Sequence, residues 1–201
     1  MAKINDVEIK SKAPIRGTKN GFRAVIYMDN ARIGTLESKD DGNGTVFCIA
    51  NAGNENTCIE RMNDYANHVK LGNFGINDFF NRLMALNEVE KYFKHEALKY
   101  KRSRKAFNVA ETQVLEQGQL VSTGKFTTLP LEKERDGKTI KDRELQRIAK
   151  SLNEKGIKFN VLTVFTSLKD FENATVINQY TQETQPDIVP EATPTPEAIT
   201  A

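Results

Sequence analysis

The chain has 201 residues, of which 38% are hydrophobic and 28% charged, and its formal net charge is +2. This length can bury a substantial core, as one domain with appendages or as two small domains. No apolar run approaches the roughly 18 residues that a membrane-spanning helix needs, and the charged opening residues lack the apolar core of a secretion signal. These features exclude a membrane protein and predict a cytoplasmic one.

The first fifty residues predict an antiparallel meander. Apolar and polar residues alternate there, and clusters of Gly, Asn and Asp separate the alternating segments. Asp29-Asn30 is typical of a tight hairpin turn. The predicted strands are residues 7–10, 22–28, 31–37 and 45–50.

Two helices are predicted next, over residues 58–68 with Thr57 as the cap, and over residues 76–107. The second begins near Asn77 or Asp78 and would be about 42 to 45 Å long at 1.5 Å per residue. Because that length exceeds the diameter of a small domain, we expect its far end to project or bend. Its apolar residues recur at three- and four-residue steps and share one side: Phe79, Leu83, Leu86, Val89, Phe93, Ala97 and Tyr100.

The remaining pattern is weaker. It predicts a helix over 141–153, closed by Gly156 in a left-handed conformation, and a polar, Pro-rich, disordered acidic tail over 181–201. Short strands are predicted at 114–115, 120–121, 124–129, 157–165 and 174–177, with a short turn at 168–171.

The elements predict an α+β fold with an N-terminal antiparallel meander packed on a long helix, followed by a smaller β-α-β portion. The expected divisions are residues 1–108, residues 109–180, which can share the same core, and the tail at 181–201.

Positive charge is concentrated in one segment. Residues 91–105 have a net charge of +6, whereas residues 181–201 have a net charge of −4. The basic segment contains Glu96 alone as an acidic residue, with Glu90 at its edge, so we expect its cations to lack carboxylate partners. The acidic tail either folds back on this segment or only maintains solubility.

The basic segment is the candidate binding site for a polyanion, because Lys and Arg neutralise phosphates and an aromatic ring can stack on a base. The alternative is a solvated helix whose lysine stems cover apolar surface. The candidate residues are Lys91, Lys94, Lys99, Lys101, Arg102, Arg104 and Lys105, with Tyr100 as the aromatic side chain.

The sequence predicts no catalytic residue, metal ligand or cofactor. His68 and His95 lack a Cys or second His at helical spacing, which argues against zinc, and Cys48 and Cys58 are expected to be ordinary thiols. The turn around residues 39–50 lacks the first and last ligands of a calcium loop. The least implausible catalytic carboxylates are Glu132 and Glu134, which a solvated hairpin explains equally well.

One stretch resembles known proteins. The passage from Val7-Glu8-Ile9-Lys10 through Gly17, Gly21–Tyr27 and Arg32-Ile33-Gly34 to Asp41-Gly42-Asn43-Gly44 resembles the opening of small uncharacterised bacteriophage and prophage accessory proteins. The likeness covers about a quarter of the chain and transfers no site. It implies a phage product in the host cytoplasm, of a kind that often blocks host enzymes or defence complexes.

The leading hypothesis is a non-enzymatic, phage-encoded accessory protein that binds nucleic acid or the acidic surface of a nucleic-acid-processing complex through its basic helix. One alternative is a host-defence inhibitor that binds a host protein without nucleic acid. Another is a metal-dependent nuclease. Oligomeric state is not predicted.

Overall fold

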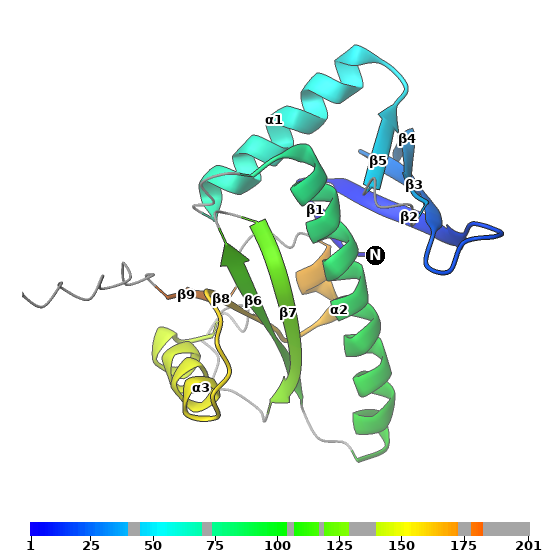
Figure 1. Ribbon diagram of the computed structural model, residues 1–201. Coiled ribbons are helices and arrows are strands. Elements are labelled where there is room, and N and C mark those ends of the chain that lie inside the picture. Colours follow the sequence, from blue (N-terminus) through cyan, green and yellow to red (C-terminus); the bar gives the residue numbers. More distant parts are fainter. Residues whose placement is uncertain are drawn as a thin grey trace, which may run out of the picture.

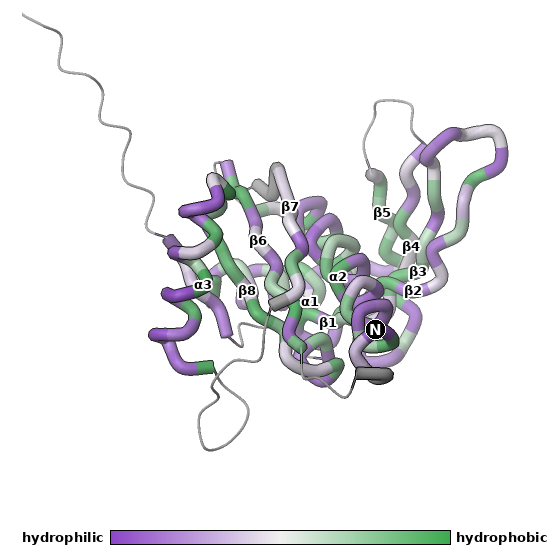
Figure 2. The backbone as a smooth tube through the Cα atoms, turned by 90° about the horizontal axis from the view of Figure 1, so that it is seen from below, coloured by the Kyte–Doolittle hydropathy of each residue, from purple (hydrophilic) through white to green (hydrophobic). Residues whose placement is uncertain are grey.

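The computed structural model describes residues 1–39, 45–69, 74–103, 107–116, 119–128, 140–172 and 178–182. Within these residues two antiparallel sheets and three α-helices confirm the α+β prediction. Figure 2 shows the layers in order: α3, the second sheet, the helices α1 and α2, and the first sheet.

Sheet A is the predicted meander, with strand order β1-β2-β3-β4-β5. Its inner face carries the buried side chains Val7, Ile9, Ala24, Ile26 and Leu36, whereas Tyr27 and Arg23 belong to the opposite face. Asp29 and Asn30 have the positive φ values, 52° and 64°, of the expected hairpin turn. The strands are β1 (Lys3–Ile4), β2 (Val7–Pro14), β3 (Phe22–Met28), β4 (Ala31–Ser38) and β5 (Thr45–Ile49).

The first helix is longer than predicted. Helix α1 spans Ala52–His68, and the side chain of Asn51, not Thr57, caps it by accepting a hydrogen bond from the Asn54 N–H at 2.8 Å. Thr57 instead donates to the Gly53 carbonyl within the helix. Gly53 and Asn54 have low helix propensity, which explains why the pattern placed the start too late.

Helix α2 (Ile76–Ser103) lies between the two sheets, as Figure 1 shows. Its first half packs on sheet A and α1 through Phe79, Phe80 and Leu83, all fully buried. Its second half lies along sheet B, where the Tyr92 hydroxyl is 3.0 Å from Thr127 Oγ1. This half of α2 is therefore supported by sheet B at Tyr92 and by Phe107 at Tyr100, while the expectation that its far end projects or bends stays a prediction.

Sheet B has the order β7-β6-β8-β9 and is antiparallel throughout. Its strands are β6 (Asn108–Glu116), β7 (Gln119–Thr128), β8 (Val161–Phe165) and β9 (Gln179–Thr181), with the 3₁₀ helix η1 (Leu168–Phe171) between the last two. The predicted fragments 114–115, 120–121 and 124–128 are parts of the single β6–β7 hairpin, and residue 129 lies outside the described residues. The strand predicted at 157–165 begins at Val161, and the one at 174–177 lies outside the described residues.

Helix α3 (Asp142–Glu154) covers the face of sheet B that is turned away from α2. Leu145, Ile148 and Leu152 pack with Leu162 and Val164 of β8 in a separate buried cluster. Gly156 has a φ of 76°, and the Ile157 N–H donates to the Leu152 carbonyl at 3.1 Å, which confirms the predicted left-handed cap.

The main core crosses the boundary expected near residue 108. One continuous cluster joins the inner face of sheet A, both long helices and Val109, Phe165 and Phe171 from the second half of the chain. Residues 183–201 of the predicted tail lie outside the described residues. Within the part of the chain that is described, no helix is long and apolar enough to cross a membrane.

Candidate functional site

The basic face of α2 consists of Lys91, Lys94 and Lys99 in its described part. Phe79, Leu83, Leu86 and Phe93 turn one side of the helix to the core, so the lysines that lie between these positions extend outward. Their side chains are 65%, 51% and 58% exposed. Their ammonium groups are therefore accessible to a partner.

Each of these three lysines has a carboxylate partner on the same helix. Lys91 Nζ lies 2.7 Å from Glu88 Oε1, Lys94 Nζ lies 2.7 Å from Glu90 Oε1, and Lys99 pairs with Glu96. The expectation that the cations lack acidic partners is wrong for Lys91, Lys94 and Lys99. Glu88 was overlooked because it precedes the basic segment, although three-residue spacing places it beside Lys91.

These pairs bias the carboxylates toward their charged form. The hydrogen bond from Lys91 lowers the pKa of Glu88, and the hydrogen bond from Lys99 lowers the pKa of Glu96. The same bond raises the pKa of Lys99. The pair of Lys91 with Glu88 is exposed on both sides and contributes little to stability, because water and salt compete with it. An anionic partner can displace Glu88 at low cost, whereas Glu90 and Glu96 are 6% and 7% exposed and would lose a partner inside the fold.

The remaining candidates lie at the end of the helix. Lys101 and Arg102 belong to the last turn of α2, while Arg104 and Lys105 lie outside the described residues. In the sequence, residues 97–105 contain Lys99, Lys101, Arg102, Arg104 and Lys105 and no Asp or Glu. Within this stretch of sequence, no Asp or Glu therefore stands three or four residues after any of these cations.

An aromatic column fixes the end of the helix to the body. Tyr100 stacks on Phe107 with 5.1 Å between ring centroids, and Phe107 lies 4.9 Å from Phe93. Phe93 in turn contacts Phe171, which stacks on Phe165 at 4.2 Å. Phe93 is 4% exposed and belongs to the core, so it offers no stacking face to a ligand. Tyr100 is half-buried and uses its ring to anchor the helix.

A cleft of about 360 Å³ opens between β2 and the middle of α2. Its apolar lining includes Met1, Ile9 and Met84, and its cations are Lys12, Lys91 and Lys94. The acidic side chains Glu88 and Glu90 also line it. Lys91 and Lys94 of the basic segment thus lie beside Lys12. About eighty residues separate β2 from this part of α2, so no sequence pattern could predict that these lysines meet.

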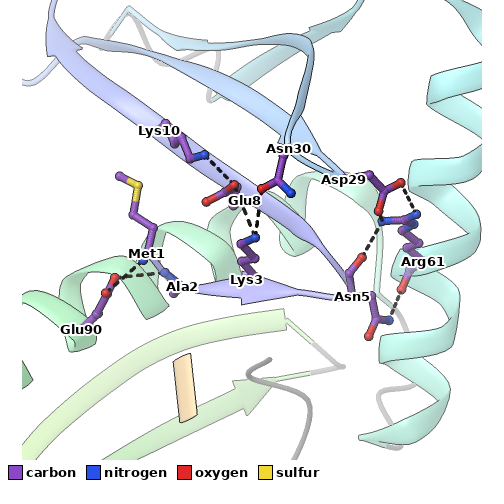
Figure 3. A network of polar contacts seen from close by, with 10 residues as sticks. All are labelled: Met1, Ala2, Lys3, Asn5, Glu8, Lys10, Asp29, Asn30, Arg61 and Glu90. Atoms are coloured by element: carbon purple, nitrogen blue, oxygen red, sulfur yellow. Dashed lines mark hydrogen bonds and ion pairs between the residues drawn. The ribbon is translucent and has the colours of Figure 1, made fainter. Parts of the chain in front are cut away.

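Glu90 holds the N-terminal strand against α2, as Figure 3 shows. Its carboxylate is 6% exposed, accepts a hydrogen bond from the Ala2 N–H at 3.0 Å and lies 3.2 Å from the Met1 amino group. Burial alone would raise the pKa of Glu90, but the hydrogen bond from Lys94 and the Met1 amino group together lower it. Glu90 is therefore engaged by three groups and is a structural carboxylate.

Two further ion-pair groups brace the same region (Figure 3). On the outer face of sheet A, Lys10 Nζ lies 2.7 Å from Glu8 Oε1, and Lys3 lies at 3.8 Å. Arg61 of α1 joins Asp29 at 2.6 Å, and this pair lowers the pKa of Asp29. These contacts tie the β1–β2 and β3–β4 turns to one another and to α1.

A buried polar network lies where α2 crosses β6. Arg82 donates to both carboxylate oxygens of Glu111, at 2.6 and 2.8 Å, and its Nε lies 3.3 Å from the Tyr65 hydroxyl. Gln113 also faces Arg82, with its amide oxygen 2.9 Å from Nη1 in the orientation that satisfies both groups. The Arg82 guanidinium and the Glu111 carboxylate therefore both have hydrogen-bond partners, and the network supplies no reactive carboxylate.

The described residues offer no metal or nucleophile constellation. Across these segments, no three His, Cys, Asp or Glu side chains converge as a metal site would require. Cys48 and Cys58 are both free thiols, and burial raises the pKa of Cys58 to about 11, which keeps it protonated. The segment at 39–44 connects β4 and β5, which pair antiparallel, as a hairpin requires. Glu132 and Glu134 lie outside the described residues.

No family model matches this chain, and comparisons with curated proteins and with solved structures give no significant match. The resemblance of the N-terminal hairpins to phage accessory proteins therefore stays a prediction. The features of the molecule that indicate a function are the basic face of α2 and the cleft beside it.

Proposed function

We propose that the protein is a non-enzymatic binding protein whose partner is polyanionic and whose contact surface is the basic face and C-terminal turn of α2. The observation that carries this proposal is a stretch of sequence, residues 97–105, that holds five cations and no carboxylate and begins on the turn of α2 that Tyr100 and Phe107 fix to the core. The proposed place of action is the cytoplasm, that of a host cell if the chain is phage-encoded.

The paired lysines fit this proposal as a secondary contact. Lys91, Lys94 and Lys99 keep more than half of each side chain in solvent. A phosphate or carboxylate of the partner can take the place of the exposed Glu88 at Lys91, and it can add to the buried glutamates as a second anion at Lys94 and Lys99. The rigid anchoring of α2 lowers the entropy lost when the partner binds, because the cations are presented from an ordered element.

A salt titration tests the proposal with two probes, a double-stranded 20-mer DNA and polyglutamate. We expect Lys101→Glu combined with Arg102→Glu to weaken binding of at least one probe by roughly tenfold or more at low salt. If both side chains contact phosphates, the variant should also reduce the dependence of log K on log salt by about 0.9 for each lost phosphate contact.

The matched control is Lys150→Glu combined with Lys155→Glu, which reverses the same number of exposed charges at α3. It should leave binding nearly unchanged, because α3 lies on the opposite side of sheet B from α2 (Figure 1). Equal effects of the two double variants, or no binding of either probe by the native chain at low salt, would refute the proposal.

A further inference from the structure

The cleft between β2 and α2 has both an apolar lining and cations, and this combination favours one class of anionic ligand over another. Ile9 and Met84 give it an aliphatic and thioether lining, while Lys12 and Lys91 supply cations from two different elements. None of its lining residues is aromatic. A nucleic-acid base would find no ring on which to stack there, whereas an aliphatic side chain would bury apolar surface.

Lys12 is the cation of the cleft that is most available to a ligand. Among the described residues it forms no close ion pair, although its charge helps to lower the pKa of Glu88, and its Nζ lies 4.4 Å from the centroid of the Phe22 ring. Lys91 and Lys94, in contrast, already pair with a carboxylate. A ligand carboxylate that reaches Lys12 therefore gains a contact without displacing a described anion.

The cleft continues along α2 as a stripe. Met84, Asn87, Lys91, Lys94 and Leu98 follow at steps of three and four residues and share one side of the helix. The stripe is about 21 Å long at 1.5 Å per residue. It ends at Leu98, which at 67% is the most exposed large apolar side chain among the described residues. Apolar positions thus lie at both ends, with cations between them.

We infer that this stripe docks a segment of a partner protein that carries several carboxylates and seats an aliphatic side chain in the cleft. This inference rests on the proposed function, and it specifies that the polyanionic partner is a protein segment with carboxylates. Charge complementarity selects an anion, because the lysines of the cleft outnumber Glu88 and Glu90, and the aliphatic lining together with Leu98 selects an amino-acid side chain over a nucleotide.

We expect the partner segment to bind through side-chain contacts and not by adding a strand to the edge of sheet A. Beyond Ile9, β2 lacks a described strand neighbour on its outer side, but this edge is protected. Ser11 has a φ of 55° within a bulge, and Pro14 has no N–H to donate. Bulges, Lys and Pro on an edge strand are devices that prevent the addition of another strand.

The test is a titration of the ¹⁵N-labelled full chain, followed by NMR. The main probe is a ten-residue peptide in which pairs of glutamates alternate with single leucines. Its controls replace every glutamate with glutamine, or every leucine with glycine. We expect saturable shifts at the amides of Ile9, Lys12 and Leu98 with the main probe, and binding at least tenfold weaker with both controls.

Two single variants locate the site. Lys12→Glu, which lies outside α2, and Leu98→Ser, which is exposed and need not alter folding, should each weaken the peptide by roughly three- to tenfold, the size expected for one exposed charge or apolar contact. Lys150→Glu and Leu168→Ser are the matched controls and should have no effect. Binding of an oligo(dT) 12-mer should be unchanged by Leu98→Ser.

The inference is overturned if the peptide gives no saturable shift at the cleft, or if the control variants weaken it as much as Lys12→Glu does. It is also overturned if the oligo(dT) shifts the same cleft amides with equal affinity, or if a peptide of residues 183–199 of this chain binds there as tightly as the main probe. If anions bind only through Lys101 and Arg102, this inference fails while the proposed function stands. If no anion binds, both fail.

Discussion

Arg82 and Glu111 form the contact on which a single substitution should have the largest effect. Arg82 is 5% exposed and Glu111 is fully buried, and each satisfies the charge of the other through two hydrogen bonds. Burial opposes the charged form of Arg82, but Glu111 and Tyr65 raise its pKa above the usual value. Replacing one partner would leave the other charge buried without compensation.

We predict that Arg82→Met lowers the free energy of unfolding by about 3 to 5 kcal/mol, the cost typical of an orphaned buried charge. Urea denaturation followed by circular dichroism measures the change. Arg82→Met combined with Glu111→Leu should recover most of the loss, because neither charge remains. A single variant that loses less than about 1 kcal/mol, or a double variant less stable than the single, would contradict this account.

At the scale of the element, the end of α2 depends on the aromatic column more than on its own helix propensity. Phe107 contacts both Tyr100 and Phe93 and is the link between the last helical turn and the core. The terminal turns carry several like charges, which repel one another. Without the ring contacts, these turns would have little reason to remain folded.

Phe107→Ala should therefore increase amide hydrogen exchange in α2 after Tyr92 while leaving exchange at Phe79–Leu86 nearly unchanged. The expected global loss of stability is about 1 to 3 kcal/mol, below the range for a fully buried Phe, because Phe107 is half-buried. Phe22→Ala is the matched control, since Phe22 is also a half-buried aromatic but lies on sheet A. If the amides at the end of α2 exchanged at the same rate in both variants, the aromatic column would not be needed to keep the end of the helix folded.

At the scale of the whole molecule, two carboxylates join different parts of the fold through their negative charge: Glu90 of α2 contacts Met1 and Ala2, and Asp29 pairs with Arg61 of α1. Glu88, Glu90, Glu96 and Asp29 all have a pKa below the ordinary value. A carboxylate whose pKa is lower in the folded state stabilises the fold above its unfolded pKa, and this stabilisation is lost as the pH falls through the folded value. The free energy of unfolding should therefore decrease below about pH 4.5.

Glu90 is the best place to test this, because it is buried and joins Met1, Ala2 and Lys94. Glu90→Gln should be less stable than the native chain at pH 7 and should lose less stability between pH 5 and pH 2.5. Thermal unfolding across that range measures both effects. Parallel stability curves for the variant and the native chain would show that Glu90 does not contribute to the acid dependence.

The sequence by itself determined the local features. Alternation over residues 22–37, the turn at Asp29-Asn30, the spacing from Phe79 to Phe93 and the glycine after α3 are each properties of neighbouring residues, and each predicted its element correctly. The β6–β7 hairpin was predicted only in fragments, because Glu111 and Gln113 are polar residues at buried positions. Their burial is stable only beside Arg82, which comes from a different element.

Only the tertiary structure decided what surrounds the basic segment. The charge of residues 91–105 can be read from the sequence, but the cleft also needs Lys12 and Ile9 from a strand about eighty residues earlier. The pairing of Lys94 with Glu90 follows from their spacing on the helix, but the burial of that carboxylate and its contacts with Met1 and Ala2 come from the packing of the N-terminus on α2. Periodicity reports contacts within one element, whereas the cleft forms where sheet A packs on α2, and that packing is set by the shared core.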